Sequence, residues 1–152
     1  MKRFLLFLSF ALILVGLGIS DYSLLNLKDR YPQMQVVFYT KDSRNLDSIN
    51  DGIYNQVYCS TDQAKKIKRL LNKIEGMSVS FEGGIQDLNF VIDYFDVKII
   101  SEKTCDDILY IYGYSSLILT PAVKINNNYI NIQLVLRKDK IIIGTPIILG
   151  SY

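Results

Sequence analysis

The stretch from Lys124 to Gly150, KINNNYINIQLVLRKDKIIIGTPIILG, decides the fold. Polar and apolar residues alternate through YINIQLVLR, and this period of two is typical of a strand with one buried face. The asparagines before it and Lys138–Asp139 after it favour turns, and a further strand begins with Ile141–Ile143. The stretch predicts an antiparallel meander. We expect Leu134 to face the core and Gln133 to lie on the opposite, polar face.

The first twenty residues have the composition of an export signal. Lys2 and Arg3 form a basic start, and residues 4–19 are almost entirely apolar. Gly18 and Ser20 are small and suitably spaced for cleavage by signal peptidase. An uncleaved membrane anchor is the alternative, although the apolar run is shorter than the ~20 residues that span a bilayer comfortably. A buried core helix is disfavoured because the run has no polar face.

Composition excludes several classes of function. The chain has no histidine, which removes Ser-His-Asp and Cys-His catalysis and the commonest zinc ligand. Without Lys2 and Arg3, fifteen basic residues face fifteen acidic ones, so no net charge attracts a phosphate backbone. The most basic local cluster also fits the solvated face of a helix; it comprises Lys65, Lys66, Lys68 and Arg69. Nucleic acid is therefore a disfavoured partner.

Two cysteines, Cys59 and Cys105, have two interpretations. In an exported protein they could form a disulfide that closes a long loop and stabilises the fold by ~3–4 kcal/mol in the chain-entropy model. Alternatively, both are small buried hydrophobic residues. The sequence does not fix the distance between them, so both interpretations stay open.

Strand and helix patterns alternate in the remaining chain. Strands are predicted over residues 33–40, 53–59, 77–82, 97–102 and 108–113. A helix is predicted from an N-cap at Ser60–Asp62 through apolar positions up to Ile74, with Gly76 ending it. A second, shorter helix is expected from Ile85 to Phe95, and a turn over Lys103–Asp107.

This order of elements predicts an α+β fold in which two helices pack on one face of an antiparallel sheet. Residues 1–20 are expected to be a signal peptide or membrane anchor, and residues 21–32 a spacer or a short helix. Residues 33–152 are expected to form a single α+β domain.

Three C-terminal segments carry a family resemblance. Gly113–Ser115 is a tyrosine-containing turn after a strand, Asn131–Arg137 reads NIQLVLR, and Gly144–Ile148 reads GTPII, with Tyr152 close behind. These segments resemble those of the YwmB family, exported proteins of spore-forming Gram-positive bacteria that are described as TATA-box-binding-protein-like. Most members are longer, and their turn at the position of Lys138–Lys140 is less tight.

The resemblance implies a curved antiparallel sheet with helices on its convex side. It implies a place in the cell envelope or in sporulation, but no established activity, no catalytic residues and no cofactor. Because a fold does not transfer its function, the TATA-box description does not imply DNA binding.

A row of tyrosines is the first candidate ligand surface. Tyr110, Tyr112 and Tyr114 alternate along one strand, so their rings share one face. Together with the amides of Asn131 and Gln133 they would suit cell-wall glycan, because rings stack on sugars and amides bond hydroxyls. The alternative is that tyrosine simply favours strands and tolerates a half-wet face. We expect the tyrosine side to be the open one.

The close acidic pairs are Asp106–Asp107 and Asp93 with Asp96. A glycosidase needs two carboxylates ~5–9 Å apart across a cleft, whereas adjacent aspartates in a turn are explained by capping and solvation. The sequence therefore favours a non-enzymatic accessory or binding protein outside the cytoplasm, with an envelope protein or wall glycan as its partner. A wall-directed hydrolase and a nucleic-acid-binding module are the alternatives.

Overall fold

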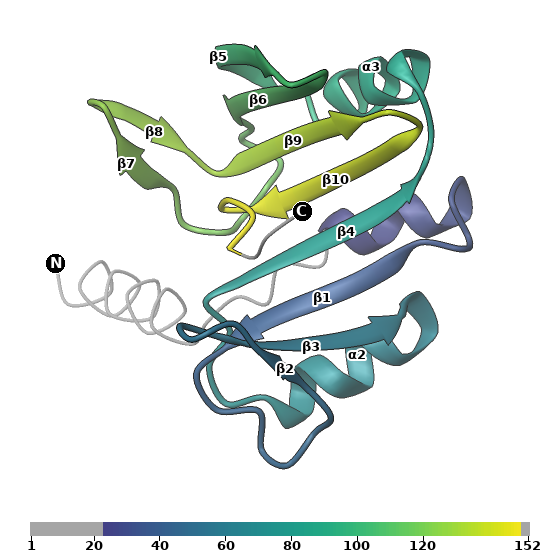
Figure 1. The fold of residues 1–152 in the computed structure, drawn as a ribbon, viewed down its shortest axis with the longest axis vertical. Coiled ribbons are helices and arrows are strands. Elements are labelled where there is room, and N and C mark those ends of the chain that lie inside the picture. Colours follow the sequence, from purple (N-terminus) through teal and green to yellow (C-terminus); the bar gives the residue numbers. More distant parts are fainter. Residues whose placement is uncertain (1–22, 150–152) are drawn as a thin grey trace, which may run out of the picture.

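The computed structural model describes residues 23–149, which form an α+β domain around one large antiparallel sheet (Figure 1). The sheet contains, in chain order, β1 (Gln35–Thr40), β2 (Ile49–Asn50), β3 (Asn55–Ser60), β4 (Gly76–Glu82), β5 (Lys98–Cys105), β6 (Ile108–Tyr114), β9 (Ile132–Arg137) and β10 (Lys140–Thr145). Their spatial order is β2-β3-β1-β4-β10-β9-β6-β5. A separate hairpin of β7 (Val123–Ile125) and β8 (Asn128–Ile130) projects from one end.

Within the described residues, three helices pack on one face of this sheet. They are the 3-10 helix η1 (Ser23–Asp29), α2 (Thr61–Leu70) and α3 (Ile85–Tyr94). The paired positions Val57, Phe38 and Met77 lie on this helix-covered face, because residues directly opposite each other on neighbouring strands share a face. Leu134 and Ile143 lie on the same face, because they are opposite each other and Ile143 is opposite Val79, two residues along β4 from Met77. The α+β prediction is confirmed.

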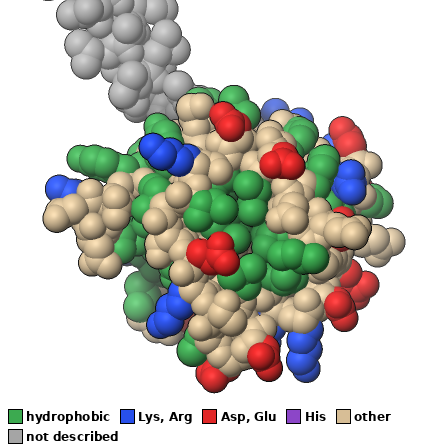
Figure 2. All heavy atoms as spheres, turned by 90° about the horizontal axis from the view of Figure 1, so that it is seen from above, with side chains coloured by type: hydrophobic (Ala, Val, Ile, Leu, Met, Phe, Trp, Pro, Cys, Tyr) green, Lys and Arg blue, Asp and Glu red, His purple; other side chains and the backbone are tan. Residues whose placement is uncertain are grey.

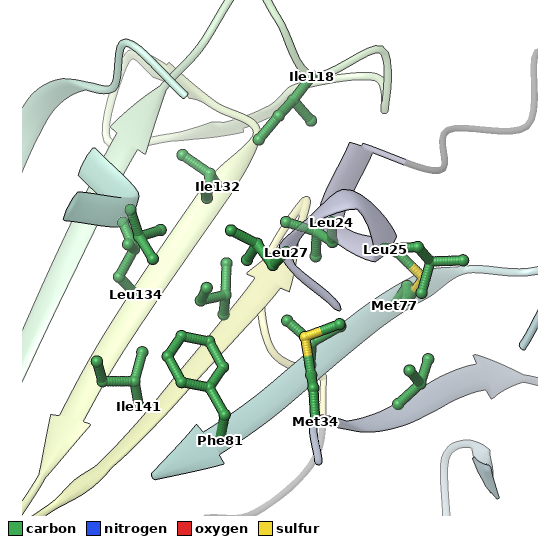
Figure 3. Close-up of a cluster of buried hydrophobic side chains, with 14 of the residues drawn as sticks. Leu24, Leu25, Leu27, Met34, Met77, Phe81, Ile118, Ile132, Leu134 and Ile141 are labelled. Carbon is green, nitrogen blue, oxygen red and sulfur yellow. The ribbon is translucent and has the colours of Figure 1, made fainter. Parts of the chain in front are cut away.

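The core is one continuous apolar cluster between these helices and the sheet (Figure 3). η1 contributes Leu24, Leu25 and Leu27, and the sheet contributes Met77, Phe81, Ile132, Leu134 and Ile141, among others. Leu88 and Val91 of α3 complete the cluster. At ~1.5–3 kcal/mol for each fully buried large aliphatic or aromatic side chain, this cluster is the main source of stability.

Residues 23–29, which precede β1, belong to this core. The predicted alternatives for residues 21–32 were a spacer or a short helix, and residues 23–29 form η1. Leu24, Leu25 and Leu27 are almost fully buried, so the spacer interpretation is wrong for this part. The prediction of a signal peptide or anchor over residues 1–20 lies outside the described residues.

Helix α2 begins as predicted but ends early. Ser60 is the N-cap of the helix, and the Ser60 backbone N–H donates to Gln63 Oε1 at 3.5 Å. The helix ends at Leu70, which is exposed, while Leu71 is extended and buried. The predicted helix end at Gly76 is wrong: this glycine begins β4 opposite Tyr39, where an added Cβ would lie 3.0 Å from a Leu149 methyl carbon.

One turn is tighter than the sequence predicted. β5 continues to Cys105, so the predicted turn over Lys103–Asp107 shrinks to Asp106 and Asp107. Both have positive φ, 49° and 62°, as a two-residue hairpin with matching twist requires. Aspartate tolerates this conformation, which explains the acidic pair at this position.

Candidate functional site

The tyrosine row faces away from the helices. On β6, Ile111 is buried in the core, while Tyr110, Tyr112 and Tyr114 point to the opposite side. The helices therefore leave the tyrosine side uncovered, as predicted, but this side is only partly open. Tyr114 is 40% exposed, but Tyr110 and Tyr112 are half-buried, so the rings do not form the fully exposed strip that a sugar platform would offer.

Asn131 is not a surface amide, contrary to the predicted ligand surface. It interrupts the predicted continuous strand between β8 and β9 and is 2% exposed. Its Nδ2 donates to the carbonyls of Ser115 at 2.7 Å and Ile118 at 3.1 Å, and its Oδ1 accepts the Ser115 N–H at 2.8 Å. The side chain thus holds the loop after β6 in place.

Gln133 is also a structural residue. It lies on the tyrosine side of β9 but is only 2% exposed, so the prediction that it lies on an open polar face is wrong. Its Oε1 accepts the Ile148 N–H at 3.0 Å. The chain after β10 turns at the cis peptide bond between Thr145 and Pro146, and this hydrogen bond attaches the following segment to the sheet.

The two cysteines do not form a disulfide. Cys59 is buried on β3 and Cys105 is exposed at the end of β5, near the opposite edge of the sheet. The six strand spacings between β3 and β5 correspond to roughly 30 Å at ~4.8 Å each, far beyond the reach of a disulfide. Burial raises the pKa of the Cys59 thiol to about 11, so this thiol is inert at neutral pH.

The remaining charged candidates have local explanations. Asp96 has a φ of 46° at the end of α3, where its N–H bonds to the Asp93 carbonyl. The basic cluster lies on the outer side of α2, opposite the buried Ala64; Lys65, Lys66 and Arg69 are exposed and Lys68 is half-buried. These residues form the solvated face of a helix.

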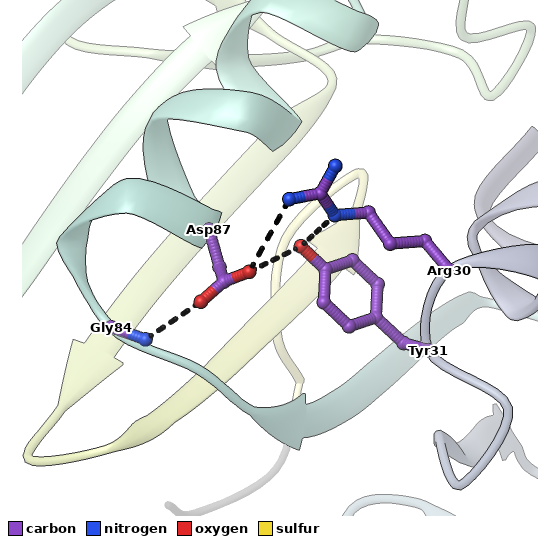
Figure 4. A network of polar contacts seen from close by, with 4 residues as sticks. All are labelled: Arg30, Tyr31, Gly84 and Asp87. Atoms are coloured by element: carbon purple, nitrogen blue, oxygen red, sulfur yellow. Dashed lines mark hydrogen bonds and ion pairs between the residues drawn. The ribbon is translucent and has the colours of Figure 1, made fainter.

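A cluster that the sequence did not predict joins Arg30, Tyr31 and Asp87 (Figure 4). The Tyr31 hydroxyl donates to Asp87 Oδ1 at 2.8 Å and accepts from Arg30 Nε at 3.1 Å. Asp87 Oδ2 accepts the Gly84 N–H at 3.2 Å, so the same carboxylate caps α3. Asp87 in the first turn of a helix was readable from sequence, but its partner Tyr31 is 56 residues away.

Aromatic packing fixes this cluster. The Tyr31 ring stacks on Phe81 with centroids 3.9 Å apart, and the Arg30 guanidinium lies 4.0 Å from the centroid of Phe90. Burial and the hydrogen bond to Asp87 raise the pKa of Tyr31 above its ordinary value of 10.0. The hydroxyl therefore stays protonated at physiological pH and acts as a donor, not as a base.

A pocket of about 590 Å³ adjoins the cluster at the end of the sheet where β4 ends and β10 begins. Its lining combines apolar side chains with two cations, one carboxylate, two amides and one hydroxyl. The aromatic and apolar residues are Tyr31, Phe81, Met34 and Pro32. The cations are Arg30 and Lys140, the carboxylate is Glu82, the amides are Gln33 and Gln35, and the hydroxyl is that of Ser80. The pocket thus offers hydrogen-bonding and charged groups next to a smaller apolar surface.

A groove of about 640 Å³ lies at the other end of the strands, between β5, β6 and the β7–β8 hairpin. Ile99, Tyr114 and Tyr129 line it together with Lys98. Seen from above, the face that carries β5 and α3 also has apolar side chains at its centre, with charged ones around them (Figure 2).

Residues 23–149 contain no helix that is both long and apolar enough to cross a bilayer. Over the same range, no three or more Cys, Asp or Glu side chains are grouped as metal ligands.

Comparisons with known proteins gave no match: no family model fits the chain, and neither a curated protein nor a solved structure is significantly similar to it.

Proposed function

We propose that this chain is an exported or membrane-tethered binding protein of the cell envelope without catalytic activity. The basic and apolar leader over residues 1–20 supports export. The resemblance to the YwmB family, with its curved sheet, supports an accessory role in the envelope or in sporulation. The observation that carries the binding role is the pocket beside Arg30, Tyr31 and Asp87.

The lining of this pocket suits a polar ligand with some apolar surface. Gln33, Gln35 and Ser80 offer donors and acceptors for hydroxyl and amide groups, while Phe81 and Met34 offer an apolar contact. Wall glycan and its peptide cross-links have this mixture of groups.

The same lining supports binding over hydrolysis. Glu82 is the one carboxylate among the described residues of the pocket, whereas glycoside hydrolysis uses a pair. The Tyr31 hydroxyl, with its raised pKa, is a poor general base at neutral pH.

Sedimentation with purified peptidoglycan tests this proposal. The full chain is expected to sediment with the wall, and Lys140→Ala is expected to lower the bound fraction several-fold because it removes a cation from the pocket rim. Lys124→Ala is the matched control, since Lys124 is an exposed lysine on β7, away from the pocket. Equal wall binding by both variants would show that the pocket is not the wall-binding site.

Two further measurements separate the alternatives. Release of soluble sugar fragments from the wall would show a hydrolase and contradict the proposal. Cell fractionation should place the tagged chain outside the cytoplasm; a soluble cytoplasmic protein with an intact N-terminus would overturn export.

A further inference from the structure

Exposed apolar side chains are concentrated at the end of the strands opposite the pocket. We define the apolar end as Ile99, Tyr114, Leu117, Leu119 and Tyr129, whose exposed fractions lie between 40% and 61%. Single exposed apolar residues are normal on a protein surface, but a group of them marks a contact surface.

These residues come from neighbouring elements. Ile99 is the second residue of β5 and Tyr114 is the last of β6. Both line the groove together with Tyr129 of the β7–β8 hairpin. Leu117 and Leu119 lie in the loop after β6. Asn131 holds this loop against the start of β9 by its bonds to the Ser115 and Ile118 carbonyls. The apolar end is therefore a fixed surface.

The described chain begins at this same surface. The Ser23 hydroxyl donates to the Leu117 carbonyl at 3.3 Å, so the chain that follows the leader enters the domain beside Leu117. Residues 4–19 of the leader are almost entirely apolar. If the leader stays in the bilayer, the few residues between it and Ser23 keep the apolar end close to the membrane.

The charges around the apolar end suit a lipid surface. From Ser115 to Asn131 the chain has a single charged residue, the exposed Lys124, and no acidic one. Lys98 lies on the groove at the start of β5. Tyrosine and leucine beside lysine are the side chains that favour the boundary between lipid headgroups and acyl chains.

The geometry points to a lipid bilayer as the partner of the apolar end: in the tethered form of the proposed function, Leu117 and Leu119 lie in the interface of the membrane that holds the leader. Because the leader keeps the domain at the surface, even a weak second contact is occupied. The pocket beside Arg30 and Lys140 then faces away from the membrane, since it lies at the other end of the strands.

Fluorescence depth measurements test this inference on the full chain. Single cysteines are introduced by Leu117→Cys, Leu119→Cys or Ile85→Cys, with Cys105→Ser removing the exposed native thiol. Ile85 is a matched control, because it is 53% exposed against 54% for Leu117 and follows the pocket end of β4. Each is labelled with an environment-sensitive dye and reconstituted into phosphatidylcholine–phosphatidylglycerol vesicles, with and without doxyl-labelled lipid.

Several-fold quenching by doxyl-labelled lipid is expected at positions 117 and 119, and none at position 85. Equal, water-like emission at all three positions in floating vesicles would overturn the docking but leave tethering intact. A blue shift at 117 and 119 without lipid quenching would show a protein contact there instead and would also overturn it. Failure of the full chain to float would overturn the inference, whereas wall binding and fractionation test the proposed function separately.

A double variant tests whether the two leucines make the membrane contact. Leu117→Ser combined with Leu119→Ser should abolish lipid quenching of a dye at Tyr129→Cys while the protein still floats through its leader. Ile85→Ser should leave that quenching unchanged. Retained quenching in the double variant would contradict a role for the two leucines.

Discussion

Two neighbouring residues of strand β9 that face opposite sides of the sheet are both buried, but by different chemistry. Leu134 on the helix-covered face is 0% exposed and Gln133 on the tyrosine face is 2% exposed. Leu134 is enclosed by apolar side chains of the helices and neighbouring strands. Gln133 is instead held by a hydrogen bond: its side-chain amide oxygen accepts the Ile148 N–H and so attaches the segment after β10 to the sheet.

This difference shows that alternation reports the side of a residue, not its depth. A strand has a polar and an apolar set, yet a polar side chain can be fully buried when it binds backbone groups of a loop. Asn131 and Gln133 both do so. The following substitutions test whether the two faces contribute to stability in the way their chemistry suggests.

Leu134→Ala should have the largest effect. Removing a fully buried leucine from the apolar cluster is expected to lower the free energy of unfolding by ~2–5 kcal/mol. Denaturant melts measure this loss. A loss below that of the polar substitutions would show that the helix-covered face does not dominate.

Asn131→Ala should cost about 2–3 kcal/mol, because the Ser115 N–H and the Ser115 and Ile118 carbonyls lose their bonds in a buried setting. Asn128→Ala, at an exposed position at the start of β8, is the control and should cost under ~0.5 kcal/mol. Similar melts for the two variants would mean that the loop after β6 does not depend on this side chain.

Gln133→Met should cost about 1–2 kcal/mol. The side chain keeps its approximate shape, but the Ile148 N–H loses its acceptor. Arg137→Met on the same face is exposed and serves as the control, with an effect under ~0.5 kcal/mol. Hydrogen exchange at Ile148 provides an independent measurement, and unchanged protection there would contradict the role of Gln133.

The smallest effect concerns pH. The pKa of Cys59 is raised from 9.0 to about 11 in the folded chain, so the unfolded thiol ionises first as the pH rises. The unfolded state then binds fewer protons, and stability falls by about 1 kcal/mol between pH 8 and pH 10. Denaturant melts of the wild type and of Cys59→Ala measure this slope, which should be shallower in the variant.

Local sequence patterns predicted most of the framework correctly. The alternation through β9, the N-cap at Ser60 and the turn residues between strands each depend on neighbours within a few positions. The structure agrees with them, apart from the ends of α2 and β5 and the break in the predicted strand at Asn131. Leu70 and Leu71 show the limit: the helical spacing included both, yet α2 ends between them, with Leu71 buried and Leu70 exposed.

By itself, the sequence determined the class of the fold, the placing of the three tyrosines on one side of their strand and the exclusion of histidine chemistry, because composition and periodicity are local properties. The tertiary structure alone decided what the polar residues do. Tyr31 meets Asp87 across 56 residues, and Asn131 reaches back 16 residues to Ser115. It also separated Cys59 from Cys105 and brought the start of the described chain to Leu117. These contacts depend on the order of strands in the sheet, which no local pattern encodes.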